Sequence, residues 1–211
     1  MSAQENILIV AAHPDDEVLG CGGAIAKHRA MGDAVRVIFL AKGVTARYDP
    51  DEFDRPDVQA AIKRRNDNAV RALSILGVPQ ENVFVSQRYC CRLDQIPLID
   101  LVKQIEGHIE QFAPTILFTH ALHDTNVDHG LAHRAVLAAT RPTANRALRT
   151  INAFEVLSST EWNPTRPFPA SAFYDISDVM DLKVAALLAY EDEVMPAPHP
   201  RSETALRAMA T

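Results

Sequence analysis

The chain has 211 residues, of which 47% are hydrophobic and 23% are charged, a composition that excludes a disordered, fibrous or membrane-bundle protein. The chain has 21 Lys and Arg residues and 27 Asp and Glu residues, so its net charge is −6. A protein with this negative charge has no general attraction for nucleic acid or an anionic membrane. The three cysteines include an adjacent pair, which is not a disulfide framework, and we find no signal peptide or integral membrane segment. We therefore expect one domain over residues 1–211, in the cytoplasm, with no nucleic-acid partner.

Strands and helices alternate along the first two thirds of the chain. The branched apolar run Ile7–Ala12 predicts a strand buried on both faces, Val18–Met31 has helical spacing, and Ala34–Ala41 predicts a second strand. The same order then repeats, with a helix at 58–76, a strand at 83–85, a helix at 96–112 and a strand at 115–119. This alternation indicates an α/β fold, with a mostly parallel sheet and helices on both faces.

The last third of the chain has a weaker pattern. We expect strands at 153–157 and 172–176 and a helix at 179–191, followed by a proline-rich loop. Residues 42–57 are polar enough to form a long loop near a site.

The first strand ends at HPDDE, residues 13–17. So many ionisable groups in one strand-to-helix turn are costly to bury unless a cation compensates their charge. His13 and Asp16 are close enough to share one ion, and Asp15 is free to act on a water molecule, which suits catalytic zinc. Alternatively, the carboxylates cap the next helix and complement its dipole. The motif alone favours neither interpretation.

A second polar cluster follows the fourth strand. His120 follows that strand, and the next residues are ALHDTNVDHGLAH. His129 or His133 could supply a third metal ligand; because they lie four residues apart on one helix face, spacing does not distinguish them. The alternative is a solvated helix start with surface histidines. The polar side chains of this run are His123, Asp124, Asn126, Asp128, His129 and His133.

Three other motifs do not indicate a site. The GCGG run at residues 20–23 falls inside the first helix instead of in the preceding turn, which argues against a dinucleotide and indicates close helix packing. The sequence has no GxSxG nucleophile turn. Cys90 and Cys91 are interpreted as structural.

Three segments together resemble the PIG-L/LmbE-like zinc-dependent de-N-acetylases: AHPDDE, THxxxDxNxDH with AVLAATRP over residues 119–142, and PHPRSE at 198–203. The resemblance implies a Rossmann-like domain, a Zn²⁺ cofactor and removal of an acetyl group from an N-acetylglucosamine-type sugar. It implies that His13 and Asp16 bind zinc and that Asp15 is the general base. Homo-oligomers are common in the family.

The family's third ligand is the last histidine of an HPDH motif, which matches Asn126 to His129 here. The resemblance therefore implies His129 as the ligand, with Asp128 as an orienting carboxylate. A different alignment would place His133 in that role. Asn126 departs from the family histidine that stabilises the intermediate or protonates the amine. His120, His123 or His199 could supply the missing imidazole, or Asn126 could act as an oxyanion donor.

The resulting hypothesis is a zinc-dependent amide hydrolase that acts on a small amino-sugar substrate. Alternatives are an amidase for another N-acyl or thiol-sugar conjugate, and an inactive metal- or sugar-binding relative, which Asn126 suggests. Because the family commonly continues beyond PHPRSE, the chain is expected to be shortened at its C-terminus. The candidate substrate-binding residues are Arg47, Arg65, Asp94, Glu161, His199 and Arg201.

Overall fold

One parallel sheet organises the protein, for which a computed structural model describes residues 4–142 and 147–210. The strand order is β3-β2-β1-β4-β5, so the winding reverses between β1 and β4, as in a Rossmann-like doubly wound sheet. The predicted fold class is confirmed. The strands are β1 (Asn6–Ala11), β2 (Ala34–Phe39), β3 (Val83–Val85), β4 (Ile116–His120) and β5 (Thr150–Phe154).

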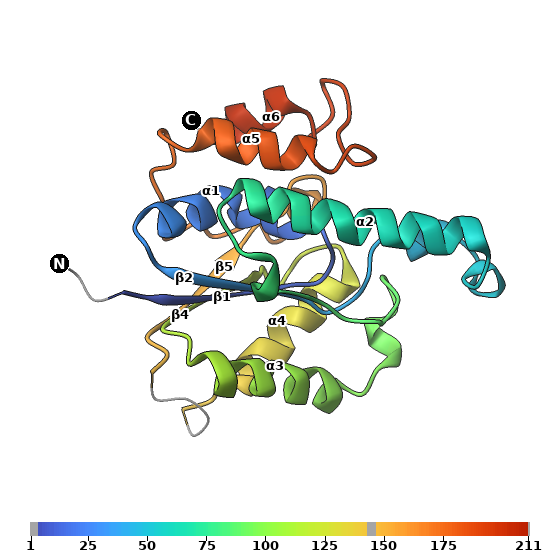
Figure 1. Ribbon diagram of the computed structural model, residues 1–211, viewed down its shortest axis with the longest axis horizontal. Coiled ribbons are helices and arrows are strands. Elements are labelled where there is room, and N and C mark those ends of the chain that lie inside the picture. Colours follow the sequence, from blue (N-terminus) through green and yellow to red (C-terminus); the bar gives the residue numbers. More distant parts are fainter. Residues whose placement is uncertain (1–3, 143–146, 211) are drawn as a thin grey trace.

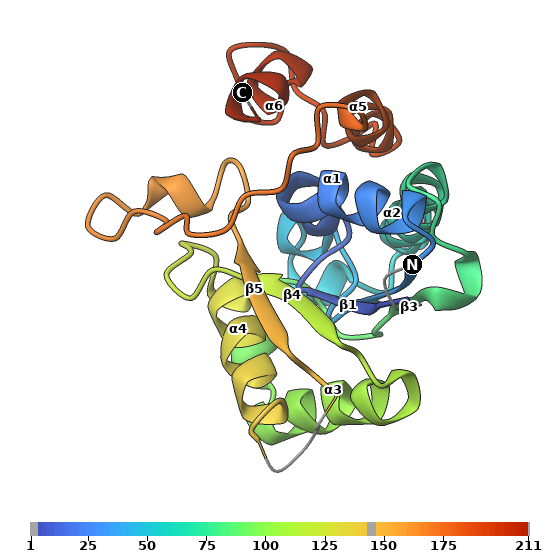
Figure 2. The same ribbon diagram turned by 90° about the vertical axis from the view of Figure 1, so that its left-hand side faces the viewer.

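Helices cover both faces of the sheet (Figure 1). On one face lie α1 (Asp16–Ala30) and α2 (Pro56–Ile75), and on the other lie α3 (Leu98–Phe112) and α4 (Val127–Ala139). The last two helices, α5 (Met180–Leu188) and α6 (Glu203–Met209), form a further layer outside α1 and α2 (Figure 2). Because α5 packs on both α1 and α2, the C-terminal part of the chain is joined to the first half.

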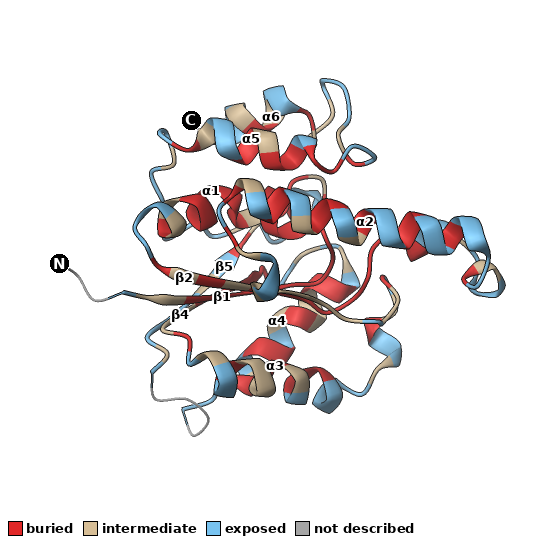
Figure 3. Ribbon diagram, in the orientation of Figure 1, coloured by how far each residue is buried: buried red, intermediate tan, exposed pale blue. Residues whose placement is uncertain are grey.

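Burial follows the sequence patterns that predicted these elements (Figure 3). Residues 7–11 of β1 are fully buried because helices cover both faces of this central strand. In α3, the buried side chains are Leu101, Val102, Ile105 and Ile109, which is the spacing of one helix face.

Two predicted elements differ in the structure. The strand expected at 153–157 lies at 150–154, and the one expected at 172–176 is wrong, because no strand forms there. Phe173 is 85% exposed, so this apolar stretch has no buried face to pair as a strand. The loop at 42–57 contains two short 3₁₀ helices, Thr45–Arg47 and Pro50–Glu52.

The small residues of α1 let neighbouring side chains approach its backbone. A Cβ atom added to Gly20 would overlap the ring of Phe154, and one added to Gly23 would lie 2.6 Å from Ile176 Cδ1. The interpretation of GCGG as a helix-packing segment is therefore confirmed. None of the described helices has the length and apolar character needed to cross a bilayer.

Candidate metal and catalytic site

The two polar clusters meet at the carboxyl edge of the sheet, where the strand order reverses. His13 lies two residues after β1, His120 is the last residue of β4, and His129 lies in the first turn of α4. Since β1 and β4 are parallel neighbours, residues that follow them are brought together at the place where such sheets bind ligands.

The HPDDE turn is held by its own backbone and by Asp16. The Oδ2 atom of Asp16 accepts a hydrogen bond from the His13 N–H at 2.8 Å. Asp15 has a φ of 124°, a conformation that costs a non-glycine residue about 1–3 kcal/mol. Although Asp15 is the N-cap residue of α1, its side chain makes no capping hydrogen bond. The capping interpretation therefore does not explain Asp15.

Three buried side chains converge as metal ligands would. His13, Asp16 and His129 each offer one ligand atom, and these atoms lie within 4.8 Å of one another. His13 Nδ1 is 3.4 Å from Asp16 Oδ2, and His129 Nε2 is 3.3 Å from Asp16 Oδ1. Ligands of a tetrahedral zinc ion are separated by about 3.3–3.4 Å. Among the described residues, His129 Nε2 has no hydrogen-bond partner, so the donor set fits zinc.

The local charge also favours a cation. Burial lowers the pKa of His129, but the carboxylates of Asp16 and Asp124 outweigh this effect and raise it to about 9. The negative field that favours a proton on this imidazole favours a metal cation in the same way.

Each candidate histidine ligand lies beside a different carboxylate. Asp124 Oδ2 lies 3.0 Å from His129 Nδ1 and accepts a 2.6 Å hydrogen bond from the Thr160 hydroxyl. Asp128 Oδ2 lies 2.9 Å from His13 Nε2, and Asp128 also accepts the backbone N–H groups of residues 91 and 93. Asp128, which the resemblance implied as an orienting carboxylate, faces His13 and not its chain neighbour His129.

The neighbouring histidines have other partners. His120 is fully buried and its Nε2 accepts the Ala12 N–H at 2.8 Å, while its ring stacks on His129 at a centroid distance of 3.9 Å. Burial holds the pKa of His120 well below its usual value. His133 Nδ1 donates to the His120 carbonyl oxygen at 2.8 Å. The structure thus brings His129, and not His133, to His13 and Asp16.

Asp15 faces a cluster of arginines. Its Oδ2 accepts hydrogen bonds from Arg65 Nη1 at 3.1 Å and from Arg201 Nη1 at 3.0 Å. Glu193 pairs with Arg65, Arg201 and Arg47. Burial raises the pKa of Asp15 to about 6, against the opposing effect of the Arg201 and Arg65 charges. The carboxylate is therefore held in position by two arginines, and its raised pKa suits a general base.

Asn126 and the remaining candidates make contacts of their own outside the group of His13, Asp16 and His129. Asn126 caps α4, because its Oδ1 accepts the Asp128 N–H at 3.0 Å. Glu161 is exposed and accepts the backbone N–H groups of residues 158 and 159, and Asp94 is exposed on a 3₁₀ helix. His199 Nδ1 accepts the Arg201 N–H at 3.0 Å. His123, which is exposed, contacts Arg166.

Two functional candidates were missed from the sequence. Asp124 belongs to the polar run after β4, but it was not singled out as a partner of His129. Glu193 follows α5 and is buried between arginines that are distant in sequence. The sequence offered no local signal for Glu193, because its partners come from residues 47, 65 and 201.

The chain is similar to several known proteins. It is 28% identical over 200 residues to a 4-oxalmesaconate hydratase of Pseudomonas putida, covering 87% of this chain and 72% of the relative. It is 26% identical over 206 residues to a probable N-acetyl-alpha-D-glucosaminyl L-malate deacetylase of Bacillus subtilis, covering 90% and 84%. Its fold matches that of the N,N'-diacetylchitobiose deacetylase of Pyrococcus horikoshii with a TM-score of 0.73 and 19% identity, covering 98% and 77%.

The family comparison covers the residues of the candidate site. The sequence model of the GlcNAc-PI de-N-acetylase family, PIG-L, matches residues 8–140. This span is more than half of the chain and includes His13, Asp15, Asp16 and His129, and the chain therefore belongs to the PIG-L family of deacetylases.

Proposed function

We propose that the protein is a zinc-dependent hydrolase that removes the N-acetyl group from an N-acetylglucosamine-type sugar or its conjugate. The observation that carries this proposal is the convergence of two imidazoles and a carboxylate beside a buried Asp15. Membership of a deacetylase family supports the reaction class, and the name of the Bacillus subtilis relative supports an amino-sugar substrate.

His13, Asp16 and His129 would hold the zinc ion. When bound there, zinc would lower the pKa of a water molecule to about 7 and polarise the amide carbonyl. Asp124 and Asp128 act on the candidate ligands: Asp128 Oδ2 is hydrogen-bonded to His13 Nε2, and Asp124 Oδ2 lies 3.0 Å from His129 Nδ1, so the other nitrogen of each imidazole is left for the metal. We assign both residues a positioning role.

Asp15 is the proposed general base. It takes a proton from the attacking water, the new C–O bond forms at the acetyl carbon, and the C–N bond then breaks. Asp15 or the His199 imidazole returns a proton to the leaving nitrogen, so the products are acetate and a free amino sugar. Arg65 and Arg201 keep the carboxylate oriented throughout, since both bind its Oδ2 atom.

Asn126 is the proposed donor to the oxyanion. Its Oδ1 is occupied by the Asp128 N–H, so the Nδ2 amide remains to donate a hydrogen bond. His120 is not suited to proton transfer, because its Nε2 accepts the Ala12 N–H in a fully buried position. We propose that the His120 ring, which stacks on the His129 ring, holds that ring in place.

Exposed polar side chains around the centre are proposed to bind the sugar hydroxyls. Arg47 is suited to this role because half of its side chain is exposed while its guanidinium is held by Glu193. Asp94 and Glu161 complete this rim. The cytoplasmic location and a homo-oligomeric state remain predictions.

Acetate release tests the proposal. Metal-stripped protein is incubated with free and carrier-linked N-acetylated amino sugars, with and without added zinc. We expect acetate only with zinc, accompanied by one equivalent of free amine. Zinc bound tightly without acetate from any substrate would contradict the deacetylase proposal and favour another amide or a binding role.

A second candidate reaction is the hydration of an unsaturated carboxylic acid. It is favoured by the similarity to the 4-oxalmesaconate hydratase over 87% of this chain. The same metal and base would then add water to a carbon–carbon double bond. This activity would appear as loss of ultraviolet absorbance of a conjugated enol acid, with no release of acetate or amine.

A further inference from the structure

A cavity of about 640 Å³ lies next to the candidate metal site and is lined by Phe154, whose ring contacts that of His120. It is lined by residues of α1, β4, α4, β5, the segment 166–176, α5 and α6, is partly open to solvent, and includes none of the three candidate metal ligands. Figure 2 shows the segment that links β5 to α5 along this side of the molecule. Its lining is mainly apolar and includes Phe118, Phe154, Phe168, Phe173, Tyr174 and Ile176.

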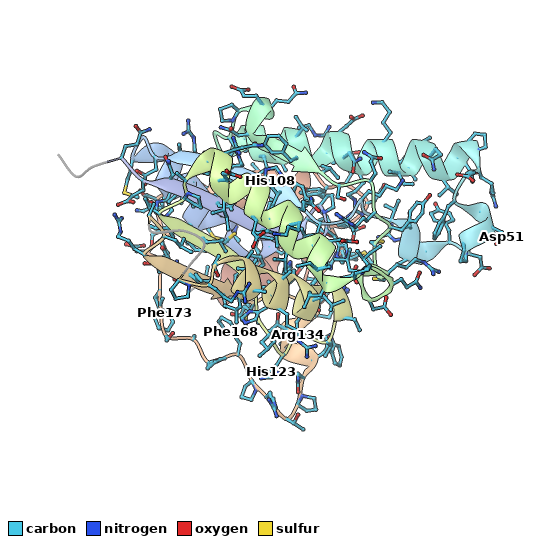
Figure 4. All side chains as sticks on the ribbon, turned by 90° about the horizontal axis from the view of Figure 1, so that it is seen from below. Asp51, His108, His123, Arg134, Phe168 and Phe173 are labelled. Carbon is cyan, nitrogen blue, oxygen red and sulfur yellow. The ribbon has the colours of Figure 1, made fainter. Side chains whose placement is uncertain are left out.

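Phe168, Phe173 and His123 lie along one edge of the molecule (Figure 4) and all three line the cavity. Its volume is in the range of about 300–1,000 Å³ that is typical of small-molecule sites. Apolar walls of this kind bind a ligand by removing its apolar surface from water.

Lys183 is the unusual member of the lining. It lies on α5, it is only 8% exposed, and among the described residues it forms neither a hydrogen bond nor an ion pair. Its Nζ is not one of the fully buried unpartnered atoms of the described residues, so the ammonium group reaches the open space of the cavity that Lys183 lines. Burial of the side chain lowers the pKa of Lys183, although the Cys21 and Glu155 side chains oppose this effect.

The charges that line the cavity sum to a positive value. Lys183 and Arg166 contribute two positive charges and Glu155 one negative charge, while the other described lining residues are uncharged when histidine is neutral. Glu155 is half-buried and does not reach ion-pair distance from Lys183. In a chain of net charge −6, an apolar cavity with excess positive charge favours an anionic ligand.

We propose that this cavity binds a small molecule in which one carboxylate is attached to an apolar body, with the carboxylate paired to the ammonium of Lys183. The apolar body lies against the aromatic side chains, and the carboxylate supplies the partner that Lys183 lacks. This site is separate from the proposed deacetylase reaction and does not depend on it.

Octanoate is the probe, and octanol is the matched uncharged compound. Binding of each is measured by titration calorimetry with wild-type protein and with Lys183→Met, Lys183→Arg and Lys103→Met. Lys103 is a suitable control because 69% of its side chain is exposed and it pairs with Glu106 outside the cavity. Thermal unfolding of each variant shows whether it is folded.

We expect one octanoate per chain and at least a tenfold weaker octanoate affinity in Lys183→Met, with octanol affinity unchanged. Lys183→Arg keeps the charge and retains octanoate binding, and Lys103→Met behaves as wild type. The proposal is overturned if millimolar octanoate does not bind to the wild type. It is also overturned if folded Lys183→Met binds octanoate as wild type does, or if Lys183→Arg loses binding as fully as Lys183→Met.

Discussion

Replacement of Asp124 by asparagine tests how the site prepares His129 for a metal. In the wild type, Asp124 Oδ2 lies 3.0 Å from His129 Nδ1, whereas Oδ1 accepts the Asn126 N–H at 2.8 Å. An asparagine keeps its oxygen on the Asn126 N–H and so turns its NH₂ group towards His129. That group donates to Nδ1 and moves the ring proton to Nε2, the atom that faces Asp16.

The expected loss is about 10–100-fold in zinc affinity, the usual effect of removing a partner of a metal-ligating histidine. This corresponds to about 1.4–2.8 kcal/mol of binding free energy. Zinc affinity is measured by competition with a chelator on metal-stripped protein. Asp94→Asn is the matched control, because Asp94 is exposed and has the same chemistry. Zinc affinity of folded Asp124→Asn within a factor of two of wild type would refute the tautomer argument.

Three further substitutions separate catalysis from stability. Asp15→Asn is expected to lower the rate of acetate release by about 10²–10⁴-fold while zinc content is kept; full activity with zinc bound would remove Asp15 as the base. Glu193→Gln is expected to lower the free energy of unfolding by about 3 kcal/mol, because it leaves Arg65 with only Asp15 as its carboxylate partner. Urea denaturation measures this loss, and an unchanged denaturation midpoint would contradict the prediction. Leu101→Ala, fully buried in α3, is expected to cost about 2–5 kcal/mol in the same assay and to leave zinc affinity unchanged; a loss of zinc binding in the folded variant would contradict that separation.

The buried strands were predictable because their residues are apolar on both faces. The run at residues 7–12 differs from β1 by one residue at each end. β5 was placed three residues too late because it is an edge strand, in which Ile151 and Ala153 are exposed. An edge strand has less need of apolar residues, so its sequence does not mark its limits.

The clustering of the candidate metal ligands was also predictable, since strand ends at a reversal point bring HPDDE and the His129 motif together. The pairing of each histidine with its carboxylate was not predictable. Asp124 and Asp128 belong to the same polar run, and only the path of the chain into α4 decides which of them faces His129. The contacts of Glu193 depend on α5 packing against α2, which no local pattern reports.

The pairing of Asp15 with Arg201 has a consequence for protein synthesis. The two residues are separated by 186 positions, so the first motif leaves the ribosome about 10–40 s before its arginine partner exists. A nascent chain that already contains every candidate metal ligand still lacks the group that helps to fix its general base. The proposed hydrolase therefore gains its complete centre only after Arg201 has been synthesised, later than every strand of the parallel sheet.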